Sequence, residues 1–76
     1  MGTYKGTVNS PAGLGLLLQQ GRMISGLTQR ELAEKLGTSQ TYIWSLENGK
    51  DIKALERIFA IMRETGVTMT IAVPND

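Results

Sequence analysis

Apolar side chains recur at helical spacing in four stretches of the chain, and each stretch begins with a helix-capping signal. The pattern predicts helices over residues 11–25, 28–36, 39–47 and 51–65, opened by Ser10-Pro11, Thr28, Ser39 and Asp51 respectively. The predicted inner faces, in chain order, are Leu14, Leu17, Leu18 and Ile24; Leu32, Ala33 and Leu36; Ile43, Leu46 and Glu47; and Ile52, Leu55, Ile58, Phe59 and Met62.

The pattern changes to strict alternation near the end of the sequence. Val67, Met69, Ile71 and Val73 share one face of the segment 67–73, and its β-branched residues favour a strand. A single strand exposes backbone groups that need partners. We therefore expect it to pair antiparallel with its own copy across a two-fold axis, burying its apolar face in a homodimer. Pairing with residues 4–8 is the alternative, and one small sheet can hold both pairings.

Residues 1–9 are polar and contain glycine, which predicts a mobile arm. A short strand is the alternative for this segment. The expected organisation is a flexible arm over residues 1–9, a four-helix domain over 10–66 and a dimerisation strand over 67–76. The predicted fold class is mostly α, with the C-terminal strand pairing across the dimer.

The second and third predicted helices have the features of a helix-turn-helix. Thr28 and Glu31 form a capping box, and Gly37 supplies the left-handed residue that ends the helix. Ala33 is small where the next helix must cross closely, and Ile43 and Leu46 hold that helix against the first. The set in this order predicts a helix-turn-helix unit.

These segments resemble the Xre (Cro/cI-like) family of DNA-binding regulators. The resemblance rests on GLTQRELAEKLGTSQ, on LENGK, on Ile43 and on Arg22 at its spacing from Gln29. The opening SPAGLG and the closing GVTMTIAV resemble the HipB-type antitoxins within that family. This resemblance implies a homodimer that represses its own operon on double-stranded DNA and binds a HipA-type kinase toxin.

The outward face of the third predicted helix is the expected recognition surface. The resemblance implies base contacts from Ser39, Gln40, Thr41 and Ser45 and a phosphate contact from Gln29. Further phosphate candidates, from their positions on and after the helix, are Tyr42, Asn48 and Lys50. The simpler alternative is that the polar residues of this face are only solvated. The amide of Gln40 can bond adenine N6 and N7 together, and Thr41 can offer its methyl group to thymine. Because this face lacks Arg and Lys, we expect a half-site rich in A·T pairs.

Three further side chains carry specific hypotheses. The resemblance implies that Arg22 and Glu47 form a structural ion pair between the first and third helices, with a direct phosphate contact by Arg22 as the alternative. Trp44 faces outward and is suited to a thymine methyl, a sugar, a partner protein or a dimer neighbour, whereas partial burial is the simpler alternative for both Trp44 and Tyr42.

Composition narrows the function. The 76 residues include no cysteine and no histidine, which removes thiolate nucleophiles, histidine bases and the usual zinc ligands, so we expect no enzyme, cofactor or metal. No apolar run is long enough to span a bilayer, and we expect a cytoplasmic, nucleoid-associated protein. The net charge of +1 provides no general positive field for nucleic acid.

The hypotheses are therefore a dimeric repressor, the same repressor with a kinase toxin as partner, and a protein-interaction module built on the same fold.

Overall fold

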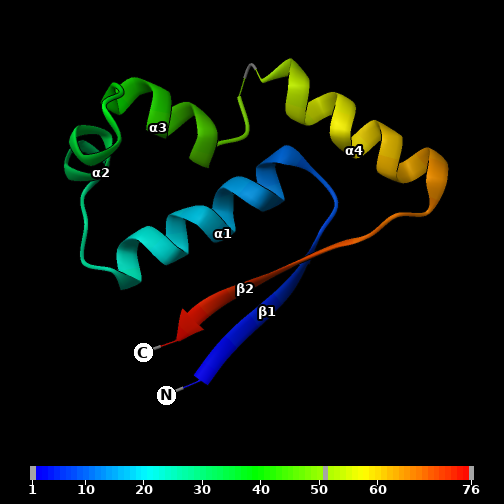
Figure 1. Cartoon of the computed structure of the whole chain (residues 1–76), viewed down its shortest axis with the longest axis horizontal. Helices are drawn as coiled ribbons and strands as arrows, with labels where there is room; N and C mark the ends of the chain where they lie inside the picture. The colour runs from blue at the N-terminus through cyan, green and yellow to red at the C-terminus, as the bar shows by residue number, and fades with distance from the viewer. Residues whose placement is uncertain (1, 51, 76) are drawn as a thin grey trace.

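A computed structural model describes residues 2–50 and 52–75 of the chain. Within these residues the element order is β1 (Gly2–Val8), α1 (Pro11–Ile24), α2 (Gln29–Leu36), α3 (Gln40–Glu47), α4 (Lys53–Thr65) and β2 (Met69–Asn75). Figure 1 shows α1 in the middle, with the other helices along one side of it and the two strands along the other. The predicted mostly helical domain is confirmed.

Polar caps open the first three helices where the sequence predicted them, and a glycine ends the second. The hydroxyl of Ser10 accepts a hydrogen bond from the Gly13 N–H at 3.0 Å, and Thr28 and Glu31 make both bonds of the capping box. Gly37 ends α2 with a φ of 69°, in the left-handed region that glycine favours. The predicted cap Asp51 lies outside the described residues. Ile52 holds the N-cap position of α4, with no side-chain cap bond.

The two strands form an antiparallel pair that runs from Gly2 opposite Asn75 to Val8 opposite Met69. The expectation of a mobile N-terminal arm is therefore wrong, as is the premise that the C-terminal strand lacks a partner in its own chain. The sequence pattern did not reveal β1, because a glycine, Gly6, occupies one of its inward-facing positions. A Cβ there would lie 3.3 Å from Leu17 Cδ1, which shows how closely α1 approaches β1.

The core lies between α1, α4 and the inner face of the sheet. Val8, Leu17, Phe59 and Val73 are buried together, and Phe59 is 1% exposed. Partly buried apolar side chains surround them: Leu14, Met62, Met69 and Ile71. The apolar face of β2, which the sequence assigned to a shared dimer layer, thus packs on its own chain.

Several apolar residues predicted to be inward are exposed in the single chain. Leu18, Ile24 and Ile58 are 48%, 42% and 44% exposed, and Leu36 is 65% exposed. Val67 is 57% exposed and precedes β2, which begins two residues later than predicted. The molecule measures 37 × 32 × 15 Å along its principal axes, so it is flat. A layer this thin leaves helix faces uncovered.

Backbone contact between α1 and α3 depends on a glycine. A Cβ on Gly15 would overlap the carbonyl oxygens of Leu46 and Glu47, so α3 approaches α1 as closely as a glycine permits. Gly21, the glycine for which the sequence suggested a close approach, has no such neighbour within 4 Å. The glycine pattern alone therefore did not predict which glycine of α1 lies at the close crossing with α3.

None of the helices in the described part of the chain combines the length and apolar character needed to cross a membrane.

Candidate nucleic-acid interface

The packing of α2 against α3 determines which face of α3 is exposed. Ala33 on α2 and Ile43 on α3 are each 3% exposed, and the two helices are joined by the turn at Gly37. Glu47, one turn after Ile43, is 7% exposed. Because these two α3 residues face inward, Gln40, Thr41 and Trp44 are presented to solvent, as the helical period requires.

An open hollow lies where the first turn of α2 meets this exposed face. It has a volume of about 320 Å³ and is lined by Gln29, Gln40, Thr41 and Trp44. Three of these are residues that the sequence assigned to DNA, two to bases and one to phosphate. None of the four is charged, so the hollow offers amide, hydroxyl and indole groups.

The remaining predicted contact residues have other surroundings. Ser39 is the N-cap of α3, and its hydroxyl accepts a hydrogen bond from the Tyr42 N–H at 3.1 Å. Asn48 is the C-cap, and its Nδ2 donates to the Trp44 carbonyl at 2.9 Å. Ser45 is half-buried, whereas Tyr42 and Lys50 are exposed outside the hollow. Two predicted DNA contacts thus already cap the helix that would carry them.

A buried ion pair ties α1 to α3 behind the hollow. Arg22 Nε lies 2.6 Å from Glu47 Oε2, and Arg22 donates a second bond to Glu47 Oε1 at 3.1 Å. Its third donor bonds the Leu27 carbonyl at 2.8 Å. The Arg22 side chain is 10% exposed, so it is poorly placed for the alternative role of direct phosphate contact.

Gln29 belongs to the same network. Its Nε2 donates to Glu47 Oε1 at 2.9 Å, which links the start of α2 to the end of α3. One amide hydrogen and the amide oxygen of Gln29 remain for a partner in the hollow. Sequence reasoning assigned Gln29 to phosphate and missed this bond, because it depends on how the two helices cross.

The network keeps Glu47 ionised. Burial alone would raise the pKa of this carboxyl, but hydrogen bonds from Arg22 and Gln29 and the guanidinium charge outweigh burial, so the pKa lies below its ordinary value. The ionised carboxylate accepts from both donors at once. The ends of α1, α2 and α3 are thereby held in one arrangement beneath the hollow.

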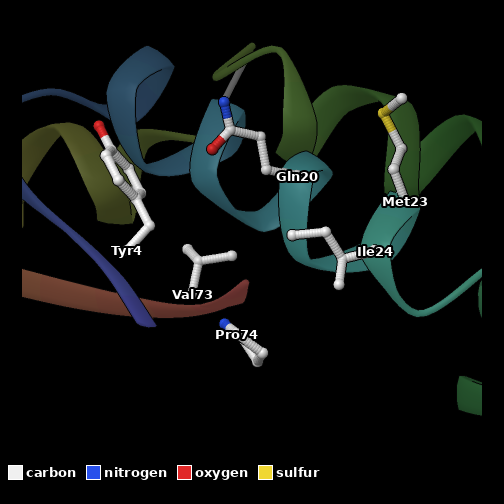
Figure 2. A pocket seen from close by; sticks show the side chains of 6 residues that line it. All are labelled: Tyr4, Gln20, Met23, Ile24, Val73 and Pro74. Atoms are coloured by element: carbon white, nitrogen blue, oxygen red, sulfur yellow. The ribbon is translucent and has the colours of Figure 1, made fainter. Parts of the chain in front are cut away.

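A second hollow, of about 540 Å³, lies between the end of α1 and the sheet. Figure 2 shows Tyr4, Val73 and Pro74 on its strand side, and the residues contributed by α1 are Gln20, Met23 and Ile24. Its walls are largely apolar and carry no charge. Tyr4 and Met23 are 53% and 62% exposed, so this is apolar surface that the single chain leaves uncovered.

The short capped helices, the glycine turn and the exposed face of α3 together define a DNA-binding helix-turn-helix domain. The family model described as "Helix-turn-helix" matches residues 18–71, and the chain belongs to this family, in its Xre type. The protein is therefore a regulator of the DNA-binding helix-turn-helix class.

The chain is similar to two curated relatives. It is 34% identical over 64 residues to Antitoxin HipB of Escherichia coli O6:H1 strain CFT073, a match that covers 84% of this chain and 68% of that protein. It is also 34% identical over 64 residues to Antitoxin HipB of Escherichia coli K12, which covers 84% of this chain and 73% of the relative. No solved structure matches the chain.

Proposed function

We propose that the protein is a sequence-specific transcriptional repressor that acts as a homodimer on a two-fold-symmetric operator. We further propose that it is the antitoxin of a HipBA-like pair, which represses its own operon and neutralises a kinase toxin. The observation that carries the DNA-binding role is the uncharged hollow at the start of α3, which brings Gln29, Gln40 and Thr41 together. A repressor without a toxin partner is the alternative.

The chemistry of the hollow suits a base edge in the major groove. Gln40 is exposed in the first turn of α3, the part of a recognition helix that meets base edges. Its amide can donate to adenine N7 and accept from adenine N6, and Thr41 beside it can contact a thymine methyl group. The α2 N-terminus next to Gln29 adds backbone donors and a partial positive charge suited to a phosphate. These groups favour an A·T-rich half-site.

The Gln40→Ala variant should weaken binding to the operator by about 1 to 3 kcal/mol and leave binding to random DNA unchanged. The measurement is a titration of the chain against DNA from upstream of its own gene, at two salt concentrations, with the mass of the complex recorded. Asn9→Ala is the control, because Asn9 is an exposed amide residue just before α1 that lines neither the hollow on α3 nor the hollow between α1 and the sheet. It should bind like the wild type.

Either of two results would contradict this assignment. Equal operator affinity for wild type and Gln40→Ala would remove α3 as the base-reading helix. Absence of any binding beyond that to random DNA would instead favour the protein-interaction module. Two chains per site and a steep loss of affinity with salt would support the repressor.

Two features of the single chain support the homodimer. The described sheet has two strands, so β2 pairs on one edge only, and an open edge invites another strand. The apolar hollow of Figure 2 is lined by Val73 and Pro74 of the same strand. A stable pair typically buries about 800 Å² on each partner, which is modest beside the total exposed area of 5353 Å².

The double variant Thr70→Glu/Ala72→Glu should convert the dimer to a monomer in sedimentation velocity. In a two-fold pairing centred on Ile71, position 70 of one chain faces position 72 of the other, so four carboxylates would meet at the seam. Both residues are exposed, and Lys5 lies opposite position 72 within the chain, so the intramolecular sheet should tolerate the change. Thr7→Glu, on the same face of β1, is the control and should remain dimeric.

An unchanged dimer mass for the glutamate variant would exclude the β2 edge as the seam. Deleting residues 67–76 is a poorer test, because Val73 is 3% exposed in the core and its loss would unfold the chain itself.

The toxin partner is supported by the similarity to the two HipB antitoxins. The reading frame next to this gene distinguishes the two forms of the proposal. A kinase-like frame that forms a complex with this chain on co-expression would support the antitoxin, whereas a neighbour of another class would favour the repressor without a toxin.

A further inference from the structure

Trp44 is the apolar member of an otherwise polar surface. Gln29, Gln40 and Thr41 line the hollow with amide and hydroxyl groups, and the indole of Trp44 completes it. The residue is 47% exposed, although a large aromatic side chain gains most by burial. An exposed aromatic residue placed among candidate base-reading groups indicates a ligand with both polar and apolar features on one edge.

The helix places Trp44 one turn beyond the candidate base contacts. It follows Thr41 by three residues and Gln40 by four, so the three side chains share one face of α3. Four residues advance a helix by about 6 Å, close to the rise of two base pairs. The carbonyl of Trp44 also accepts the Asn48 Nδ2 bond, which stabilises the last turn of α3.

We propose that Trp44 is a specificity-determining residue that packs its indole on the C5-methyl group of an operator thymine, within about two base pairs of the base read by Gln40. This inference rests on the proposed DNA-binding function. The thymine methyl is the large apolar group that the major groove presents beside its hydrogen-bonding edges. Contact with it removes both the methyl group and the indole from water, and it explains why an aromatic residue borders an uncharged hollow.

The test compares thymidine with deoxyuridine, which differs from it only by the missing C5-methyl group. Each half-site thymine is replaced singly in the operator duplex identified with wild-type protein, and affinity is measured by fluorescence anisotropy of labelled DNA. At one position the wild type should lose about fourfold in affinity, the effect of one methyl group. Trp44→Ala should bind the thymine and uracil duplexes equally at that position.

Tyr42→Ala is the matched control. Tyr42 is an aromatic residue of α3 that is 52% exposed and does not line the hollow, so its variant should keep the discrimination between thymine and uracil. Trp44→Phe retains an aromatic ring and should keep part of it. Because the chain contains one tryptophan, its emission should also change with operator DNA and much less with random DNA. Far-UV circular dichroism verifies that each variant is folded.

Three results would overturn the proposal. The first is a Trp44→Ala variant that still binds the thymine duplex more tightly than the uracil duplex. The second is a variant whose affinity for every duplex falls by the same factor, which would indicate that Trp44 contacts sugar or phosphate. If the wild type ignores every methyl group and Trp44→Ala binds DNA normally, the residue serves a protein partner instead. Failure of the DNA-binding function itself is a separate result, because the wild type would then bind every tested duplex no more tightly than random DNA.

Discussion

Replacing Arg22 by methionine should lower the free energy of unfolding by about 3 to 5 kcal/mol, the largest effect expected for one substitution in this chain. Methionine fills much of the space of the arginine stem but removes the charge and all three hydrogen bonds that Arg22 donates. Glu47, which is 7% exposed, would remain in place without its counter-ion. Urea denaturation at pH 7 measures the loss.

Arg30→Met is the matched control for this prediction. Arg30 follows Gln29 on α2 but is exposed, so its removal should change stability by no more than about 0.5 kcal/mol. Equal losses for the two variants would contradict a special role for the buried pair and would indicate a general effect of positive charge.

The stability difference between the wild type and Arg22→Met should also depend on pH, which tests the Arg22–Glu47 ion pair independently. In the wild type the pKa of Glu47 lies below its ordinary value of 4.5, so the stability due to its charge is complete above that pH and is lost as the pH falls. Without Arg22, burial dominates and raises the pKa of Glu47. As the pH falls and this carboxyl is protonated, the variant therefore becomes more stable relative to the wild type. The stability gap should therefore narrow from pH 7 to pH 4.

A gap that stays constant with pH would show that lost packing, and not charge, explains the effect. The Glu31 carboxylate also has a lowered pKa, because it accepts the backbone N–H of Thr28 in the capping box. It is present in both proteins, so its titration cancels from the difference.

Local signals account for the parts of the fold that sequence reasoning predicted well. The capping box at Thr28 and Glu31 and the left-handed Gly37 act over a single turn of chain, so the residues themselves determine the ends of α2. The strand β1 lacked such a signal. Its inward positions include Gly6, which carries no apolar side chain and so conceals the alternation of a strand.

Helical periodicity and family resemblance predicted part of the site, namely which residues face outward. Periodicity orients Gln40, Thr41 and Trp44 outward once Ile43 is placed inward. The bond between Gln29 and Glu47 joins residues 18 positions apart, so it follows from the crossing of α2 and α3 and not from any local pattern. The DNA roles of all these residues stay predictions until they are measured.

The glycines of α1 look alike in sequence, and their replacement by alanine provides the second large test. Gly15→Ala should destabilise the protein by about 3 kcal/mol, because the new methyl group would overlap the Leu46 and Glu47 carbonyls and force α3 away from α1. Gly21→Ala should instead stabilise it by about 0.5 to 1 kcal/mol, since alanine favours helix and meets open space there. Thermal and urea unfolding measure both variants.

The same pair of variants tests whether the crossing of α1 and α3 positions the recognition helix. In the Gly15→Ala variant, the fraction that still folds should bind operator DNA more weakly, because the displaced end of α3 carries Glu47 and disturbs its bond to Gln29. Gly21→Ala should bind as the wild type does. If Gly15→Ala kept full stability and affinity, α3 could move away from α1 at little cost, and the close backbone contact would not be what orients the hollow.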